Sequence, residues 1–159
     1  MVIILLESRM KQEKLVLLLN SIKIGEMKME DCIFCKIANG EIGSLVYENE
    51  FVAAFDDLNP QAPVHTLIVP KKHIENIESL DFGSGEGCHH GENHEEKAEP
   101  CDGRYIKEIF KAIKEVAKIK GVNETGYRVI SNCGKDAGQT VMHLHFHLIA
   151  GKELGDKIV

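Results

Sequence analysis

Near its carboxyl end the chain alternates histidine with apolar residues, and this pattern limits the possible folds more than any other feature. Residues 141–149 read Val-Met-His-Leu-His-Phe-His-Leu-Ile, with a period of two. We therefore predict a β-strand over 141–149 with one apolar face, packed on a core beneath a helix. Its other face carries three imidazoles spaced about 6–7 Å apart: His143, His145 and His147. Such a row is typical of a metal site, of a polar outer surface or of catalysis.

The segment just before this strand is a glycine-containing loop over residues 132–140. Gly134 and Gly138 allow backbone N–H groups to turn toward an anion, and Thr140 adds a hydroxyl donor. Phosphoryl transfer needs donors for the phosphate oxygens and a nucleophile whose pKa lies near neutral pH. The loop and the histidines together therefore favour chemistry on a phosphate.

The remaining pattern from residue 31 onward predicts a series of short elements. We expect a capped helix over 31–40, a hairpin of strands over 44–48 and 51–56, and a turn over 59–63. Further strands are expected over 65–69 and 127–133. Residues 104–120 place apolar side chains on one stripe with lysines opposite, which predicts a long amphipathic helix ending at Gly121.

Composition and charge exclude several classes of protein. The 159 residues are 43% hydrophobic and 28% charged, as in ordinary globular domains. The net charge of −6 resides in residues 81–102, so there is no broad basic surface, and we expect no nucleic-acid partner. The apolar runs, such as those at residues 2–6 and 15–19, are far shorter than a membrane span, so we expect no membrane partner. We predict a cytoplasmic protein with reduced cysteines.

Two segments differ from the rest. Residues 1–28 form a leader, either an amphipathic helix or a stretch that precedes a true start at Met27 or Met29. We predict one domain over 29–159, with an acidic insertion at 83–103 that contains histidine and cysteine. This insertion is expected to be a solvated loop, the alternative being a labile metal site at Cys88, His89, His90, His94 and Cys101.

Residues 139–147, Gln-Thr-Val-Met-His-Leu-His-Phe-His, resemble the signature of the histidine triad family, in its nucleotide-binding HINT-like branch. A second match is Pro-Val-His at 63–65 followed by Ile-Val-Pro-Lys-Lys-His at 68–73. The resemblance implies an α+β fold, an antiparallel sheet of about five strands with one long helix packed on a face. It also implies a homodimer that pairs through this helix and an edge strand.

The resemblance further implies a purine nucleotide-binding hydrolase that cleaves nucleoside monophosphates linked to amines, a phosphoramidase, without an organic cofactor. His145 would attack the phosphorus to form a nucleotidyl-histidine, and His65 would be a fourth histidine of the site. His147, Asn132, Gly138, Gln139 and Thr140 would contact the phosphate, with Thr140 assisting the leaving group. Asp57 would bind the ribose beside Leu58, and an apolar slot for the purine would comprise Ile33, Phe34, Ile37 and Phe55.

Other functions remain open. The alternatives are a dinucleoside polyphosphate hydrolase, a nucleotidyltransferase, or a non-catalytic regulator that binds nucleotide or zinc.

A pair of cysteines, Cys32-x-x-Cys35, raises the question of a metal. By itself this spacing also fits a redox pair or two buried thiols. Some members of the superfamily that carry the pair complete a zinc site with two histidines, which correspond here to His73 and His143. The resemblance therefore implies a structural Zn²⁺ bound by two cysteines and two histidines.

Overall fold

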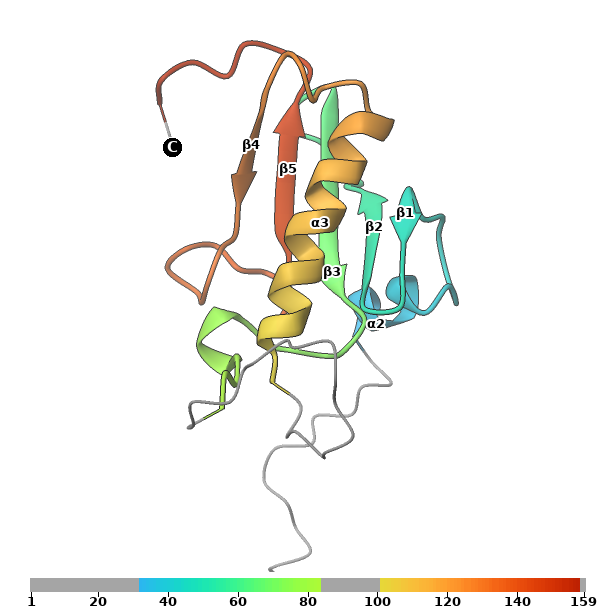
Figure 1. Ribbon diagram of the computed structural model, residues 1–159. Helices are drawn as coiled ribbons and strands as arrows, with labels where there is room; N and C mark the ends of the chain where they lie inside the picture. Colours follow the sequence, from blue (N-terminus) through green and yellow to red (C-terminus); the bar gives the residue numbers. More distant parts are fainter. Residues whose placement is uncertain (1–31, 84–100, 158–159) are drawn as a thin grey trace, which may run out of the picture.

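The computed structural model describes residues 32–83 and 101–157 of the chain. The predictions for the leader at 1–28 and for most of the insertion lie outside these residues. The described part forms one five-stranded antiparallel sheet in the order β1-β2-β3-β5-β4 (Figure 1). Its strands are β1 (Tyr47–Glu48), β2 (Val52–Asp56), β3 (Val64–Pro70), β4 (Tyr127–Ile130) and β5 (Phe146–Ala150). The predicted α+β fold is confirmed.

One face of the sheet is covered by the long helix α3 (Gly103–Ile119), as Figure 1 shows. The stripe predicted from the sequence provides its contact surface, since Ile109, Ile113 and Val116 are buried in the main core. The helix ends where Gly121 adopts a positive φ of 68°, which lets the Val122 N–H donate to the Ala117 carbonyl at 2.9 Å. No helix in the described ranges is both long and apolar enough to span a membrane.

The opposite face of the sheet carries the short helix α2 (Ile33–Ala38) and a smaller apolar cluster. Phe34 and Ala38 of this helix pack with Phe55 of β2 and Leu67 of β3. His147 lies directly opposite Leu67 in the antiparallel register, so it shares this face of the sheet. The face that carries α2 is therefore the one where the histidines gather.

The predicted strand over 141–149 is wrong at its beginning, because β5 begins only at Phe146. Before that point the His143 N–H donates to the Val141 carbonyl at 2.8 Å, and the Leu144 N–H donates to the Ile74 carbonyl at 2.6 Å. These bonds replace a strand ladder and turn the backbone away from the sheet. The predicted separation of apolar side chains from the histidines is still correct, since Leu144 belongs to the core under α3.

Three other predicted elements are shorter than expected. Of the strands expected over 44–48 and 127–133, only the residues of β1 and β4 form a strand. The helix expected over 31–40 is confined to α2. The N-cap of α2 is Cys32, whose side chain makes no capping hydrogen bond. A three-residue 3-10 helix, η2 (Ile77–Ser79), was not predicted; the Asn76 side chain caps it by accepting from the Ser79 N–H.

Candidate functional site

A cavity of about 640 Å³ opens on the α2 face of the sheet, a size typical of small-molecule sites. Nine of the residues predicted from the sequence line it: Ile33, Phe34, Ile37, Phe55, Asp57, Leu58, Thr140, His145 and His147. Seven other lining residues were not predicted as site residues: Ile42, Gly43, Ser44, Asp56, Asn59, Leu67 and Val141. Val141 lies within the 139–147 signature and could have been found from it, whereas the other six are brought to the cavity by the fold.

The ring of His145 has a defined proton arrangement at the wall of this cavity. Its Nδ1 lies 2.6 Å from the His143 carbonyl oxygen, which can only accept a hydrogen bond. The proton of the neutral imidazole is therefore on Nδ1, and the lone pair is on Nε2. The Ser131 hydroxyl donates to the His145 carbonyl at 2.9 Å, which holds the backbone of this residue as well. His145 thus presents a basic, nucleophilic nitrogen.

His147 carries the opposite arrangement because of its contact with His65. The Gln61 backbone N–H donates to His65 Nδ1 at 3.1 Å, so the proton of His65 is on Nε2. That N–H points at His147 Nδ1, 2.9 Å away, and makes it an acceptor. The proton of His147 is then on Nε2, a buried atom with no partner among the described residues. An anion in the cavity would supply the missing acceptor.

The pKa of His147 strengthens this assignment. Burial, aided by the neighbouring His145 and His65 rings, lowers the pKa of His147 from 6.5 to about 4. A proton added at Nδ1 would also face the N–H of His65. His147 is therefore neutral at pH 7 and remains a hydrogen-bond donor at Nε2.

Asp57 lies beside this histidine pair. Its Oδ2 is 3.5 Å from His65 Nε2, and its Oδ1 accepts from the Asn59 N–H at 2.8 Å. Asp57, His65 and His147 bring one donor atom each to within 4.8 Å, as a metal site would. However, a metal on His65 Nε2 would require the proton to move to Nδ1, where it would collide with the Gln61 N–H. The geometry favours a hydrogen-bonded chain over a metal site.

Hydrogen bonds of its own residues hold the glycine-containing loop over 132–140 in place. The buried Gln139 side chain accepts from the Gly134 N–H at 2.9 Å and donates to the Glu75 and Val141 carbonyls at 2.7 and 3.1 Å. The N–H groups of Gly138 and Gln139 donate to the Lys135 and Gly134 carbonyls, so they are engaged in the loop. Asn132, Gly138 and Gln139 lie outside the cavity lining, and their contact with phosphate stays a prediction.

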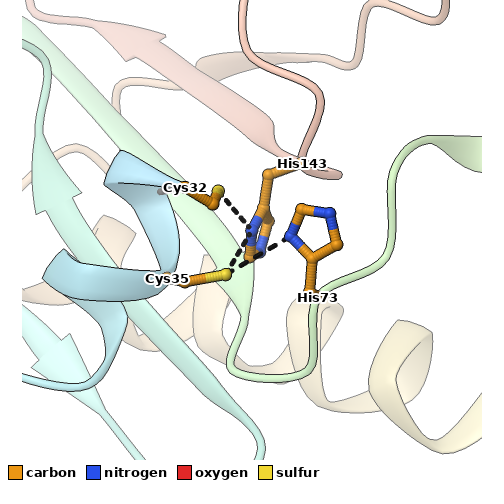
Figure 2. Close-up of side chains that lie close together, drawn as sticks. All are labelled: Cys32, Cys35, His73 and His143. Carbon is orange, nitrogen blue, oxygen red and sulfur yellow. Dashed lines mark hydrogen bonds between the residues drawn. The ribbon is translucent and has the colours of Figure 1, made fainter. Parts of the chain in front are cut away.

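The structure brings the residues of the second predicted cluster together (Figure 2). Cys32 precedes α2, Cys35 lies within it, His73 follows β3 and His143 precedes β5. His143 Nδ1 is 3.5 Å from Cys32 Sγ and 3.4 Å from Cys35 Sγ, and His73 Nδ1 is 3.3 Å from Cys35 Sγ. The four donor atoms lie within 4.8 Å of one another. This arrangement can bind a metal ion.

The hydrogen bonds of His143 are those expected of a histidine that binds a metal ion. Its Nε2 lies 2.9 Å from the Pro70 carbonyl oxygen, so Nε2 carries the proton and Nδ1 directs its lone pair at the thiols. Burial lowers the pKa of His143 to about 4 and, with the neighbouring Cys32, raises the pKa of Cys35 to about 12. A soft divalent cation would replace the thiol proton and complete a tetrahedral set of two sulfurs and two nitrogens.

Residues 40–154 match the family described as the HIT domain, which is more than two thirds of the chain. The chain therefore belongs to the HIT-domain family, whose signature the alternating histidines resemble. It is 37% identical over 127 residues to the purine nucleoside phosphoramidase of Escherichia coli, an alignment covering 79% of this chain and 92% of that protein.

Solved structures agree. A HIT family hydrolase from Clostridium thermocellum is 42% identical, with a TM-score of 0.66, and the match covers 83% of this chain and 100% of the other. A histidine triad protein from Clostridium difficile is 45% identical with a TM-score of 0.66, covering 82% and 99%.

Proposed function

We propose that the protein is a hydrolase of purine nucleoside monophosphates linked through phosphorus to an amine, and that His145 is its nucleophile. One observation carries the proposal. The Nε2 lone pair of His145 and the unpartnered Nε2–H of His147 belong to rings that line the same cavity. A nucleophile and a donor for a phosphoryl oxygen are thus side by side, with the two ring centroids 5.0 Å apart.

The reaction follows in two steps. His145 Nε2 attacks the phosphorus, a nitrogen–phosphorus bond forms to the ring, and the bond to the amine breaks with its electron pair leaving on the amine nitrogen. The amine takes up a proton from water, relayed by the Thr140 hydroxyl at the cavity wall, which gives its own proton to the amine and regains one from the water. Water then attacks the nucleotidyl-histidine, which releases the nucleoside monophosphate, one proton and neutral His145. His147 donates to a phosphoryl oxygen throughout.

The cavity is suited to the remainder of a nucleotide. Ile33, Phe34, Ile37 and Phe55 supply apolar walls for the purine, and Asp57 supplies an acceptor for ribose hydroxyls beside Leu58, which is 93% exposed. The relative from Escherichia coli is named for an activity on purine nucleosides of this kind, which supports the same substrate class here. No step in this scheme calls for an organic cofactor.

We further propose that Zn²⁺ is bound by Cys32, Cys35, His73 and His143 in a structural role. All four protein ligands are then used, so the ion has no open position for substrate. It would attach the segment that carries α2 to the segment that precedes β5. Metal analysis of purified protein should return one zinc per chain.

A homodimer and a cytoplasmic location complete the proposal. β4 is an edge strand of the sheet, and the exposed Phe110 of α3 packs on Phe146 with ring centroids 6.1 Å apart. An edge strand and an exposed aromatic on the adjacent helix are what pairing through this side of the molecule requires. Sedimentation should give twice the chain mass of 17.7 kDa, and Phe110→Asp should restore the monomer.

The catalytic proposal is tested by trapping the intermediate. Protein incubated briefly with an adenosine 5′-phosphoramidate is quenched and digested, and the adenylylated peptide is sequenced by mass spectrometry. We expect the adduct on His145 and its loss in His145→Ala, with turnover lower by at least about 10³-fold. A panel of dinucleoside polyphosphates and nucleotidyl acceptors discriminates the alternative activities. Equal rates for His145→Ala and wild type would refute the proposal.

A further inference from the structure

We infer that the Cys32–Cys35–His73–His143 cluster does more than hold the chain together: when it binds zinc, it positions the nucleophilic ring of His145. The inference rests on the proposed function. It assigns Phe34 and His143 as positioning residues, which act on His145 without touching substrate at the reacting atoms. Three separate contacts link the cluster to His145.

The first contact runs through the backbone of a ligand. His143 contributes Nδ1 to the cluster, and the carbonyl oxygen of the same residue accepts the Nδ1–H of His145 at 2.6 Å. The His143 ring is fully buried and is held at its other nitrogen by the Pro70 carbonyl. Fixing this ring fixes the direction of its carbonyl, and that carbonyl sets both the orientation and the proton position of His145.

The second contact runs through the first turn of α2, which lies between the two cysteines. Phe34 lies between Cys32 and Cys35 in sequence, and its ring packs edge-on against His145 with centroids 5.3 Å apart and an interplanar angle of 82°. The same ring packs on Phe55 and lines the cavity. Ligation of both cysteines would hold the first turn of α2 and therefore press Phe34 against one side of the nucleophile.

The third contact joins the two histidine ligands. Ile74, the residue after His73, accepts the backbone N–H of Leu144, the residue after His143, at 2.6 Å. A zinc ion bound by His73 and His143 would cross-link the same two segments one residue away. The residue after Leu144 is His145, so the backbone that carries the nucleophile is held at the residue just before it.

Without zinc, these contacts depend on weak interactions. In the structure the side chains of the cluster are joined only by contacts between sulfur and ring nitrogen. Sulfur and nitrogen at 3.3 to 3.5 Å make weak hydrogen bonds, whereas zinc–ligand bonds are short and directional. Loss of the ion should therefore leave the fold in place and loosen the ring of His145.

The experiment combines kinetics with a direct observation of the ring. Zinc-loaded and chelator-treated wild type are compared with Cys35→Ser, which removes a ligand, and Phe34→Leu, which retains all four. Cys101→Ser is the matched control, because it removes a thiol outside the cluster. Zinc content, kcat and KM for an adenosine 5′-phosphoramidate, circular dichroism and the ¹⁵N–¹H signal of the His145 Nδ1–H are measured for each.

Zinc removal should lower kcat about tenfold, a typical cost of losing a residue that orients a reacting group, with a smaller change in KM. The Nδ1–H signal of His145 should shift or broaden by exchange with water. Phe34→Leu should retain its zinc and have a lower kcat than wild type. Zinc removal should lower the kcat of Phe34→Leu by a smaller factor than that of wild type, since the substitution and zinc removal both act on the ring of His145.

The proposal would be overturned by a sharp, unshifted Nδ1–H signal and unchanged kcat in zinc-free protein, or by full additivity of Phe34→Leu and zinc removal. A protein that binds no zinc overturns it as well. If wild type hydrolyses no phosphoramidate, the proposed function fails, and the Nδ1–H signal alone then decides the positioning claim. If zinc-free protein loses its circular dichroism spectrum, zinc removal unfolds the protein, and zinc-loaded Phe34→Leu then decides. A shifted Nδ1–H signal and a lower kcat in that variant would support the proposal, and wild-type values would overturn it.

Discussion

The arrangement of the histidines predicts that His147 weakens the fold in acid, and the size of the effect can be worked out. In the folded chain its pKa is lowered to about 4, whereas an unfolded histidine has a pKa of 6.5. Between these values the unfolded chain binds a proton at this residue and the folded chain does not. Acid therefore favours the unfolded state, and the contribution of neutral His147 to stability is complete above pH 6.5.

The loss develops as the pH falls from 6.5 toward 4. At about 1.4 kcal/mol per pH unit, the whole window corresponds to about 3 kcal/mol in the free energy of unfolding. His145, His65 and Asp57 are the titratable groups that act on the ring, the histidines lowering its pKa and the carboxylate raising it. Replacing His147 with glutamine removes the titrating group and retains an N–H donor for the cavity.

Urea unfolding at pH 7 and at pH 4.5, with wild type and His147→Gln side by side, measures the difference. Wild type should lose about 2 to 3 kcal/mol more than the variant between the two pH values, because the other groups titrate in both proteins. An NMR titration of the wild-type histidines provides a second measurement, in which His147 should stay neutral down to about pH 4. Equal losses in the two proteins would show that the ring is not held neutral by its surroundings.

Three further predictions follow from single contacts. Gln139→Ala should lower the free energy of unfolding by about 2 kcal/mol in urea, since a buried N–H and two carbonyls lose a partner; a loss below about 0.5 kcal/mol would contradict the bracing role. Gly138→Ala should cost about 1–2 kcal/mol, because φ is 78° there; Lys135→Ala, which keeps the carbonyl that Gly138 binds, is the control that should not. Asp57→Asn should weaken calorimetric binding of adenosine 5′-monophosphate about tenfold and leave the 2′,3′-dideoxy analogue unaffected; equal weakening of both would remove Asp57 from ribose recognition.

Much of the fold could be predicted because local patterns carry it. The period of 3.6 over 104–120 is repeated in the buried stripe of α3, and the glycine after it ends the helix as expected. The turn at 59–63 separates β2 from β3 because its two prolines cannot contribute to a ladder. Alternation after residue 141 correctly separated Leu144 and Leu148 from the histidines.

The same alternation could not show where the strand begins. A period of two describes any extended chain, and only the hydrogen bond from Leu144 to Ile74, 70 residues earlier in the sequence, diverts the backbone before Phe146. That diversion separates the rings, sending His143 to the cysteines and leaving His145 at the cavity.

The chemistry of each histidine depends on contacts between distant segments. The sequence identifies His65, His145 and His147, but it does not show which nitrogen of each ring carries the proton. The carbonyl of His143 and the N–H of Gln61 make that choice, and with it one ring becomes a nucleophile and another a donor. Residue types and their spacing are local properties, so they could be read directly from the chain. Tautomer, burial and pKa arise from atoms that only folding brings together, and for this reason they had to come from the structure.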